Sequence, residues 1–452
     1  MKLLYFLSAF LLLGLFSCGD DPIVPPTPSG PQQYGVPLAS VPNVDQAIIY
    51  EVNLRAQSAA GTLQGVISKL QHIKDLGTNV IWLMPIYEQG ITNSVNSPYS
   101  VKDYTKVSPE YGTLDDLREL TNQAHALGMA VILDWVANHT SWDHPWITDH
   151  PEWYSKNSAG QIIIPPGTNW NDVADLNFDQ VAMRKAQIDA MKYWTLEANI
   201  DGFRCDYADG VPFDFWQDAI SALRGIPNRD ILMLAEGVRT DHYQAGFDLT
   251  YGWNFYSALK NVWTGSSTNT LTTSHQTEYN NMPSGKGKIR FTTNHDESAW
   301  DASPMSLFNG KNGALAASVV NIFSGGVPLL YTGQEVGKTG TTPFFTNSNI
   351  NWTANPDMLA TYQALNAFYL ANDCARKGSL SAYQISSDLV CWKKTYGSKD
   401  LLILVNVRNT TINFNLPPIL TGSFENALSL QTENISSAMS LGAYGYKILK
   451  MN

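Results

Sequence analysis

Cysteine is scarce in this sequence, and its scarcity excludes two classes of protein. Four cysteines occur among 452 residues, at positions 18, 205, 374 and 391. Their spacing matches neither a zinc site nor the dense disulfide framework of a small secreted domain. A bridge between Cys374 and Cys391 is a pairing that the sequence leaves open. The fold must therefore rest on a hydrophobic core, for which 44% hydrophobic residues are ample.

Charged residues, and basic ones in particular, are also few. They make up 15% of the chain, and 29 Lys and Arg face 40 Asp and Glu, for a net charge of -11. This balance argues against nucleic acid or an anionic membrane surface as a partner. Aromatic residues are abundant instead, with 13 Trp and 21 Tyr, which suits both large cores and sites that bind sugar rings.

The N-terminus carries a targeting segment rather than part of the fold. The apolar run from Leu3 to Phe16 follows Lys2 and is too short to span a membrane comfortably. Leu15-Phe-Ser-Cys18 resembles the lipobox of bacterial lipoproteins, which implies cleavage before Cys18 and lipid attachment to its thiol. We therefore expect a signal peptide over 1–18, a Pro-rich tether over 19–43, and an exported cell-envelope lipoprotein on the outer membrane, the cell surface or the periplasmic face. A plain secretory signal is the alternative.

The rest of the chain alternates apolar strands with amphipathic helices. The strands are continuous apolar runs, as in a parallel sheet that is buried on both faces. Eight strand and helix repeats predict an α/β fold, a (β/α)8 TIM barrel over 44–374 with a short insertion after strand three. Short strands with turns follow and predict an all-β sandwich domain over 375–452. The predicted barrel strands are 48–54, 80–84, 130–136, 202–206, 231–236, 247–253, 289–293 and 327–331, and the main helices are 62–76, 113–128, 181–198, 211–224, 314–323 and 356–371.

Polar residues gather where these strands end. Because the carboxyl ends of barrel strands surround one cleft, their side chains should meet in a shared site. An isolated Arg-x-Asp pair is usually a structural ion pair, but here carboxylates follow three of the strands. The residues collected in this way are Asp134, Asn138, His139, Arg204, Asp206, Glu236, Asn294, His295 and Asp296.

Four ordered blocks among these residues resemble the α-amylase family, glycoside hydrolase family 13. They are Asp134-Trp-Val-Ala-Asn-His139, Gly202-Phe-Arg-Cys-Asp206, Glu236 in Leu-Ala-Glu-Gly, and Phe291-Thr-Thr-Asn-His-Asp296. The resemblance implies that Asp206 is the nucleophile, Glu236 the general acid/base and Asp296 a third acid. It also implies that substrate is bound by Tyr99, His139, Arg204 and His295. The insertion over 140–178 would be a small version of the family's domain B.

The implied reaction is hydrolysis of α-1,4-glucosidic bonds in starch, maltodextrin or related α-glucans with retained configuration. Retention needs a carboxylate nucleophile about 5–5.5 Å from a protonated acid. We expect the apolar setting of Glu236 to raise its pKa, and Arg204 to depress the pKa of Asp206. A transglycosylase, an exo-α-glucosidase or a cyclomaltodextrinase of the same family, and a non-catalytic glucan-binding protein, are the alternatives. We expect a monomer.

Two further expectations concern an ion and a departure from the family pattern. Asn138 and Asp175 resemble family positions that bind a structural Ca²⁺, and their oxygen donors suit that ion, although a site without calcium is an equal alternative. No organic cofactor is expected. Starch-cutting members of the family often carry a Lys-His pair where this chain has Asp209 and Gly210, so the subsites for the leaving group remain open.

Overall fold

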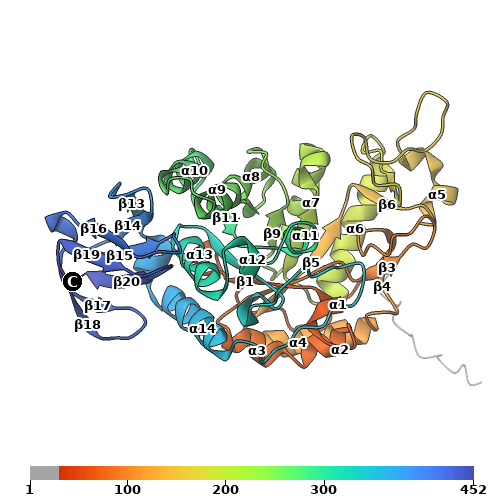
Figure 1. Ribbon diagram of the computed structural model, residues 1–452. Coiled ribbons are helices and arrows are strands. Elements are labelled where there is room, and N and C mark those ends of the chain that lie inside the picture. The colour runs from red at the N-terminus through yellow and green to blue at the C-terminus, as the bar shows by residue number, and fades with distance from the viewer. Residues whose placement is uncertain (1–29, 452) are drawn as a thin grey trace, which may run out of the picture.

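The computed structural model describes residues 30–451 and contains a closed barrel of eight parallel strands (Figure 1). The strand order around the barrel is β1-β12-β11-β10-β9-β8-β5-β2. The predicted TIM barrel is therefore confirmed, and each strand lies within its predicted run except β11, which begins two residues earlier and ends three residues earlier than predicted. The strands are β1 (Ile49–Val52), β2 (Val80–Leu83), β5 (Ala130–Val136), β8 (Gly202–Asp206), β9 (Leu232–Ala235), β10 (Leu249–Tyr251), β11 (Gly287–Arg290) and β12 (Val327–Tyr331).

Helices cover the outside of the barrel. The predicted helix over 62–76 is wrong as a single element, because the chain breaks at Ser68 and Lys69 into two short helices. Thr62 caps the first of them by accepting a hydrogen bond from the Gly65 N–H. The longer helices and their neighbours are α1 (Leu54–Gln57), α2 (Leu63–Ile67), α3 (Leu70–Asp75), α4 (Leu114–Ala126), α6 (Val181–Glu197), α7 (Phe213–Arg224), α8 (His242–Ala245), α9 (Trp253–Trp263), α10 (Asn269–Tyr279), α11 (His295–Trp300), α12 (Pro304–Leu307), α13 (Lys311–Phe323), α14 (Pro356–Ala371) and α15 (Asp373–Lys377).

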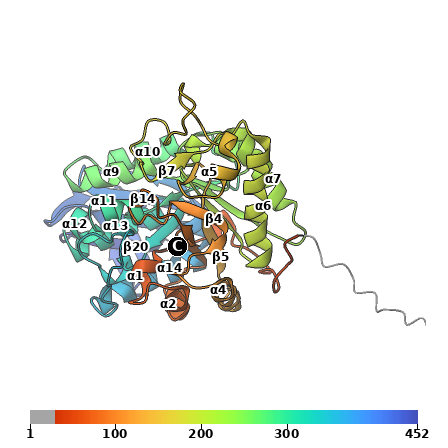
Figure 2. The same cartoon turned by 90° about the vertical axis from the view of Figure 1, so that its right-hand side faces the viewer.

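Two excursions rise from the carboxyl ends of the barrel strands. One is the hairpin of β3 (Tyr87–Gln89) and β4 (Val101–Val107). The other is the insertion after β5, with β6 (His139–Ser141), α5 (Trp146–Asp149) and β7 (Val173–Asp175). Figures 1 and 2 both place the insertion at the edge of the barrel opposite α2 and α4. A small apolar cluster around Trp153, Tyr154 and Leu176 packs the insertion against Met183 of α6.

The start of β8 requires a glycine. Gly202 has φ +155°, and a Cβ at this position would lie 2.0 Å from the carbonyl oxygen of Leu232. A side chain there would push β9 away from β8, whose next residues lead to Arg204 and Asp206. The glycine therefore permits the close strand packing that positions the end of β8.

Residues 30–47 lie against the amino-terminal end of the barrel. The Tyr34 N–H donates to the carbonyl of Leu196, and the guanidinium of Arg118 lies over the Tyr34 ring. Val41 is buried in the cluster that fills the barrel interior. The predicted tether over 19–43 is thus limited at its C-terminal side, since from Gln32 onward the chain is bonded to the barrel. The predicted signal peptide and Cys18 lie outside the described residues, and the helices of residues 30–451 include none that could cross a membrane.

The C-terminal residues form two antiparallel sheets, which confirms the predicted all-β domain. A six-stranded sheet has the order β13-β14-β15-β20-β17-β18, and β16 pairs with β19 in a second sheet. Alternate residues of β15 face opposite ways: Ile403 packs toward the barrel, whereas Leu402 and Leu404 pack toward Phe414 of the second sheet. In Figure 1 this domain lies at one end of the molecule beside α13 and α14. Its strands are β13 (Ser379–Ala382), β14 (Leu389–Tyr396), β15 (Lys399–Asn406), β16 (Ile412–Asn415), β17 (Gly422–Asn426), β18 (Thr432–Ile435), β19 (Ala438–Leu441) and β20 (Tyr446–Met451).

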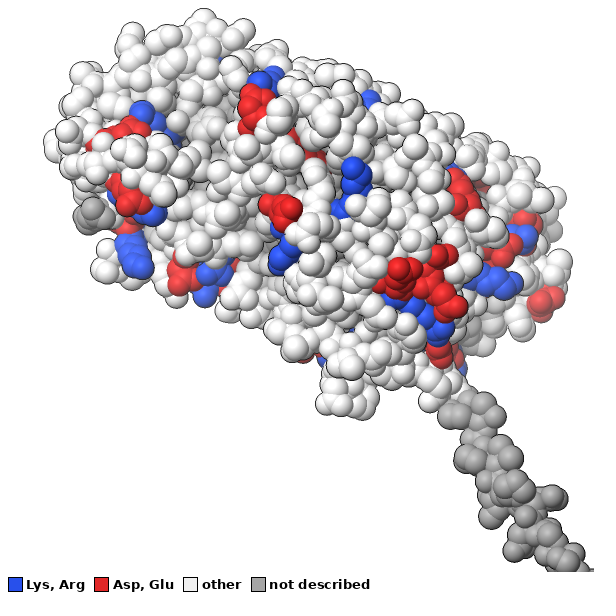
Figure 3. Space-filling view, turned by 90° about the horizontal axis from the view of Figure 1, so that it is seen from below, with Lys and Arg blue, Asp and Glu red and all other residues white. Residues whose placement is uncertain are grey.

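The described cysteines are not joined in the fold. Cys205, Cys374 and Cys391 are free thiols, and all three are buried. Trp392 is buried at the contact with the barrel, where its indole N–H approaches the Thr272 hydroxyl. On the face seen in Figure 3, acidic and basic side chains form small mixed groups.

Candidate active site

A cleft of about 690 Å³ opens where the barrel strands end, and six of the predicted site residues line it. Asp206 from β8, Glu236 after β9, and His295 and Asp296 from α11 line this cleft. Tyr99 from the loop before β4 and His139 from β6 line it as well. The expectation of one shared cleft at the strand ends is therefore confirmed for residues that lie far apart in the sequence.

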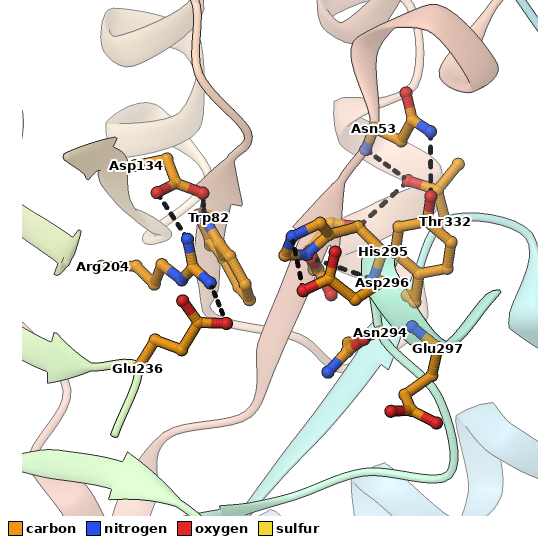
Figure 4. A network of polar contacts seen from close by, with 12 residues as sticks. Asn53, Trp82, Asp134, Arg204, Glu236, Asn294, His295, Asp296, Glu297 and Thr332 are labelled. Carbon is orange, nitrogen blue, oxygen red and sulfur yellow. Dashed lines mark hydrogen bonds and ion pairs between the residues drawn. The ribbon is translucent and has the colours of Figure 1, made fainter. Parts of the chain in front are cut away.

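Arg204 joins three carboxylates at the floor of the cleft. Its Nη1 donates to Asp134 Oδ1 at 2.8 Å and to Asp206 Oδ1 at 2.9 Å. Its Nη2 lies 2.8 Å from Glu236 Oε1, an ion contact without hydrogen-bond geometry. Figure 4 shows the guanidinium between Asp134 and Glu236, beside Trp82. Burial opposes the charge of this guanidinium, but the surrounding carboxylates raise the pKa of Arg204 further above its usual value.

Burial dominates the protonation of Asp206. The carboxyl is removed from water, which raises the pKa of Asp206, and the positive charge of Arg204 only partly opposes this effect. The nearby Asp296 carboxylate raises it further. The expected depressed pKa is therefore wrong in direction. Arg204 limits the rise that burial causes, and it does not push the pKa below the ordinary value.

Glu236 follows the expected direction. Burial raises the pKa of Glu236, with Arg204 opposing and Asp206 adding to the rise. Its Oε2 accepts a hydrogen bond of 2.7 Å from the backbone N–H of Tyr207. The carboxyl groups of Asp206 and Glu236 thus share one guanidinium within one cleft. The predicted separation of about 5–5.5 Å between them stays a prediction.

Asp296 and His295 face these groups from the other side of the cleft (Figure 4). His295 Nε2 lies 2.8 Å from the Tyr99 hydroxyl and 3.5 Å from Asp296 Oδ2, and the Tyr99 and His295 rings stack at 5.4 Å. Its Nδ1 lies 2.5 Å from Glu51 Oε1. Burial works against a charged imidazole, but the carboxylates of Asp296 and Glu51 raise the pKa of His295 to about 9.

Glu51 is a member of this network that we did not select from the sequence. It stands in the apolar strand β1, it is fully buried, and its Oε2 has no hydrogen-bond partner among the described residues. Thr332 and Asn53 hold the end of β1 in place, since the Thr332 hydroxyl donates to the Glu51 carbonyl. A lone carboxylate inside an apolar strand was the available signal.

His139 and Asp134 are placed differently from these residues. Burial lowers the pKa of His139 to about 4, so the imidazole in the cleft is neutral near pH 7. Asp134 lies beneath the cleft, where burial raises its pKa to about 7. It accepts hydrogen bonds from Trp82 Nε1 at 3.2 Å and the Tyr99 hydroxyl at 3.1 Å. Its contacts fit a positioning residue for Arg204 and Tyr99.

Comparison with known proteins decides the family of the chain. The family described as "Alpha amylase, catalytic domain" matches residues 43–161 and 153–380. The chain belongs to the α-amylase family. It is therefore a glycoside hydrolase, as the sequence blocks implied.

Individual members of the α-amylase family resemble the chain at moderate identity. Alpha-amylase 3 of Dictyoglomus thermophilum is 28% identical over 360 residues, which is 70% of this chain and 69% of the relative. The oligo-1,6-glucosidase of Bacillus cereus is 32% identical over 196 residues, 36% of this chain and 34% of the relative. The crystal structure of an alpha-amylase from Lactobacillus plantarum matches with a TM-score of 0.82 at 30% identity, covering 90% of this chain and 99% of that one.

This α-amylase-family chain has Asp209 and Gly210 where the common pattern has a Lys-His pair. Asp209 connects the loop after β8 to the loop that follows Glu236. Asp209 accepts hydrogen bonds from the backbone N–H groups of Val238 and Arg239 and from His242 Nε2. A Cβ on Gly210 would lie 2.3 Å from the Tyr207 ring. Tyr207 itself has φ +42°, a left-handed conformation that non-glycine residues rarely adopt. Asp209 therefore fixes the loop that follows Glu236, and Gly210 leaves room for the Tyr207 ring.

The candidate calcium ligands lie at the start of the insertion and near its end, with Asn138 just before β6 and Asp175 at the end of β7. The Asn138 carbonyl accepts from the Leu176 N–H, and Asp175 pairs with His139 across β6 and β7. Burial raises the pKa of Asp175 to about 6, so its carboxylate lacks full compensation. An amide oxygen and a carboxylate are donors of the kind that Ca²⁺ takes, and backbone carbonyls or water would have to supply the rest of its six to eight ligands. Among the described residues, no three His, Cys, Asp or Glu side chains cluster closely enough to hold a metal.

Proposed function

We propose that the chain is a retaining glycoside hydrolase that cleaves α-1,4-glucosidic bonds of starch, maltodextrin or related α-glucans by double displacement. One observation carries the proposal: Arg204 holds Asp206 and Glu236 together in the cleft, and Asp296 faces them across it. Two carboxyl groups on the two sides of a scissile bond are the requirement for this chemistry. Relatives named alpha-amylase support the substrate class.

In the first step Glu236, protonated through its raised pKa, gives its proton to the leaving glycosidic oxygen. Asp206 attacks the anomeric carbon at the same time and forms a covalent glycosyl-enzyme. In the second step the Glu236 carboxylate takes a proton from water, which attacks the same carbon and releases Asp206. The two inversions restore the original configuration.

The remaining residues of the cleft bind the sugar whose bond is broken. Tyr99 stacks below that ring, and Asp296, His295 and His139 bond its hydroxyls as positive charge develops at the anomeric carbon. His295 is protonated near pH 7 whereas His139 is neutral, so the two imidazoles offer the sugar different hydrogen-bonding groups.

The proposal is tested with Asp206→Asn and Glu236→Gln, and with Asp400→Asn in the C-terminal domain as the matched control. We expect kcat on maltoheptaose to fall by about 10³-fold or more for the two site variants and to stay within about twofold for the control. Proton NMR should show the α-anomer as the first product of the wild-type enzyme. Full activity of Asp206→Asn, or a β-anomeric first product, contradicts the proposal.

A second activity within the family is favoured by one observation, namely similarity to an oligo-1,6-glucosidase. An exo-α-glucosidase, a cyclomaltodextrinase or a transglycosylase would use the same acids with another choice of bond or acceptor. Product analysis on amylose, pullulan, cyclodextrin and maltoheptaose separates them. Products of intermediate length from amylose support the hydrolase, whereas glucose alone indicates exo action.

We further propose that the protein is exported and anchored to the cell envelope through lipid on Cys18, and that it acts as a monomer. The apolar run from Leu3 to Phe16 and the lipobox-like Leu15-Phe-Ser-Cys18 support the export and the lipid anchor. Labelling of growing cells with a radioactive fatty acid should mark the wild-type chain and not Cys18→Ser. Light scattering of the purified protein should give the mass of a single chain, somewhat below the 49.9 kDa calculated for all 452 residues because the signal peptide is removed.

We also propose a structural Ca²⁺ bound by Asn138 and Asp175. The buried carboxylate of Asp175, with its pKa of about 6, would be stabilised by a cation, which supports the assignment. Added Ca²⁺ should raise the Tm of chelator-treated wild-type protein and leave that of Asp175→Asn unchanged. An equal response of both proteins contradicts the site.

A further inference from the structure

Trp300 is an exposed tryptophan on the same short helix as Asp296. It is 68% exposed, yet it lines the same cleft as the acids. The two residues are four apart in α11, so they project from one face of the helix, separated by about 6 Å along its axis. Burial in the hydrophobic core does not account for this side chain.

An aromatic path leads from the acids to Trp300. The Phe344 ring lies 5.9 Å from Tyr99 and 5.4 Å from His295. Phe345 lies 4.5 Å from Phe344, and Trp300 lies 5.5 Å from Phe345. All of these side chains line the cleft. The path therefore runs without interruption from the sugar-binding tyrosine to the surface.

The loop that carries the two phenylalanines is held rigidly. Arg55 donates to the Phe344 carbonyl at 2.7 Å and forms a two-pronged ion pair with Glu110. The Asn96 side-chain amide donates to the Phe345 carbonyl. A buried arginine with this many bonds fixes the backbone around it. The aromatic surface is thus preformed.

The other face of α11 is anchored as well. Asn294 caps the helix through the Glu297 N–H, and Glu297 accepts from the Tyr256 hydroxyl at 2.8 Å and from Lys260 Nζ at 3.2 Å. The helix therefore presents Asp296 and Trp300 in a fixed orientation toward the cleft.

The side of the cleft follows from the proposed chemistry. Glu236 must lie beside the leaving oxygen, so the leaving group occupies the Glu236 side, next to Tyr207. Figure 4 places Asp296 on the opposite side of the site, beside His295. The non-reducing part of a glucan, which becomes bound to Asp206, therefore extends past Asp296 toward Phe344, Phe345 and Trp300.

We propose that Trp300, supported by Phe344 and Phe345, binds a glucosyl ring on the non-reducing side of the ring that is cleaved. This inference rests on the proposed function and deepens it. The C–H groups on the face of a pyranose ring pack on flat aromatic side chains, which form preorganised apolar sites with little conformational entropy to lose. A site that binds at least two glucosyl units before the scissile bond selects oligosaccharides over single glucosyl groups, and it separates this enzyme from an exo-α-glucosidase whose site ends at one ring.

The test compares Trp300→Ala with the wild-type enzyme on two substrates. Maltoheptaose can reach Trp300, whereas α-D-glucosyl fluoride places one ring at Asp206 and none beyond it. We expect kcat/KM on maltoheptaose, relative to kcat/KM on the fluoride, to fall about tenfold, mainly through KM. Trp300→Phe should recover most of this ratio, and Tyr396→Ala, an exposed aromatic in β14, should leave it at the wild-type value.

One result overturns the inference while the proposed function stands: a ratio that is unchanged in Trp300→Ala, whether neither substrate is affected or both lose activity equally. A wild-type enzyme that hydrolyses neither substrate overturns the proposed function and the inference with it. Reducing-end-labelled maltoheptaose gives an independent readout, because loss of the ring site should shift cleavage toward bonds with fewer glucosyl units on the non-reducing side. An unaltered cleavage pattern also overturns the inference.

Discussion

The two ends of the barrel's inner core are built from opposite kinds of side chain. At the amino-terminal end, Leu38, Val41 and Val44 from the N-terminal segment close the barrel against apolar residues such as Leu249. At the carboxyl-terminal end, the same core ends under Trp82, and the fully buried Arg204 lies on that ring with its centre 5.0 Å away. One end is an apolar plug and the other is a buried cluster of charges.

The apolar end of the barrel core therefore contributes to stability, and the charged end contributes to catalysis. Burial of apolar surface stabilises the fold in proportion to its area, whereas burial of charge costs free energy unless every group is paired. The charged end accepts that cost, since it leaves Glu51 Oε2 and Arg204 Nη2 without hydrogen bonds among the described residues. Changes at the carboxyl-terminal end of the barrel core (the upper end) should therefore alter activity and pH dependence. Changes at its amino-terminal end (the lower end) should alter stability alone.

The largest effect is expected for Arg204→Met. Removal of the guanidinium leaves Asp134, Asp206 and Glu236 without their shared cation, so the free energy of unfolding should fall by about 3–5 kcal/mol near pH 7. Activity on maltoheptaose should fall at least about 10³-fold. Urea denaturation and steady-state kinetics measure the two effects.

The matched control for this change is Arg184→Met. Arg184 also contacts two carboxylates, Asp214 and Asp218, but both of these are exposed. Such a surface pair contributes at most about 1 kcal/mol, and the control should retain activity. Equal loss of stability in both variants would contradict the contrast between the buried cluster and the surface.

A change at the lower end should reduce stability and leave activity intact, and Val41→Asp tests this. Val41 is 9% exposed and packs in the barrel core, so a carboxylate there should lower the free energy of unfolding by about 2–4 kcal/mol. The kcat measured well below the Tm should stay within about twofold. Val36→Asp on the same segment is the control, since Val36 is 82% exposed and its change should be nearly neutral. A loss of kcat in Val41→Asp would show that the two ends are not independent.

The sequence predicted the upper end better than the lower one. Carboxylates after successive apolar strands must meet if the strands form a parallel barrel, and so Asp206, Glu236 and Asp296 could be named from pattern alone. The role of residues 30–43 could not be named in this way. Prolines and small residues indicated an extended segment, and only the three-dimensional fit shows that Val41 closes the barrel.

Other parts of the site depend on contacts that no local pattern encodes. The direction of the pKa of Asp206 was wrong because it depends on full burial and on Asp296, which is distant in the sequence. Trp300 was not selected from the sequence. Its place in the cleft depends on the loop of Phe344 and Phe345, and this loop is held by Arg55, which is distant in the sequence. Strands β17 to β19 could not be bounded from the sequence, because their exposed residues are polar and their apolar positions few.

A smaller, pH-dependent effect is expected at the upper end for Glu51→Gln. His295 has a folded pKa of about 9, above the ordinary 6.5, so its stabilising contribution is complete below pH 6.5 and is lost as the pH rises through 9. Loss of the Glu51 charge should lower that pKa. The variant should therefore be less stable than wild type, on the order of 1–2 kcal/mol near pH 6.5, and the difference should shrink toward pH 10.

NMR titration of labelled histidine side chains measures the pKa, and urea denaturation between pH 6 and 10 measures the stability. Glu152→Gln is the control, because Glu152 pairs with His150 on the surface, where both side chains are about half exposed. A difference between wild type and Glu51→Gln that is constant over this pH range would contradict the proposed coupling to His295.

The smallest effect is expected for Asp209→Asn, at the edge of the charged cluster. Its carboxylate is held by His242 and by the N–H groups of Val238 and Arg239, and these bonds hold the pKa of Asp209 below its usual value although burial opposes them. Asp209→Asn keeps one acceptor oxygen and loses the charge, so the loop after Glu236 should loosen without unfolding the barrel. We expect kcat/KM on maltoheptaose to fall about two- to fivefold, with a change of less than about 1 kcal/mol in stability.

Asp241→Asn separates the role of Asp209 from a general effect of charge, because Asp241 pairs with the same Arg239 at an exposed position. This control should retain the wild-type kcat/KM. If Asp209 fixes the leaving-group side of the cleft, its substitution should act on maltoheptaose and leave α-D-glucosyl fluoride nearly unaffected, since fluoride needs no contact there. An equal loss on both substrates would instead place the effect of Asp209 on Glu236 itself, through the Tyr207 N–H that binds it.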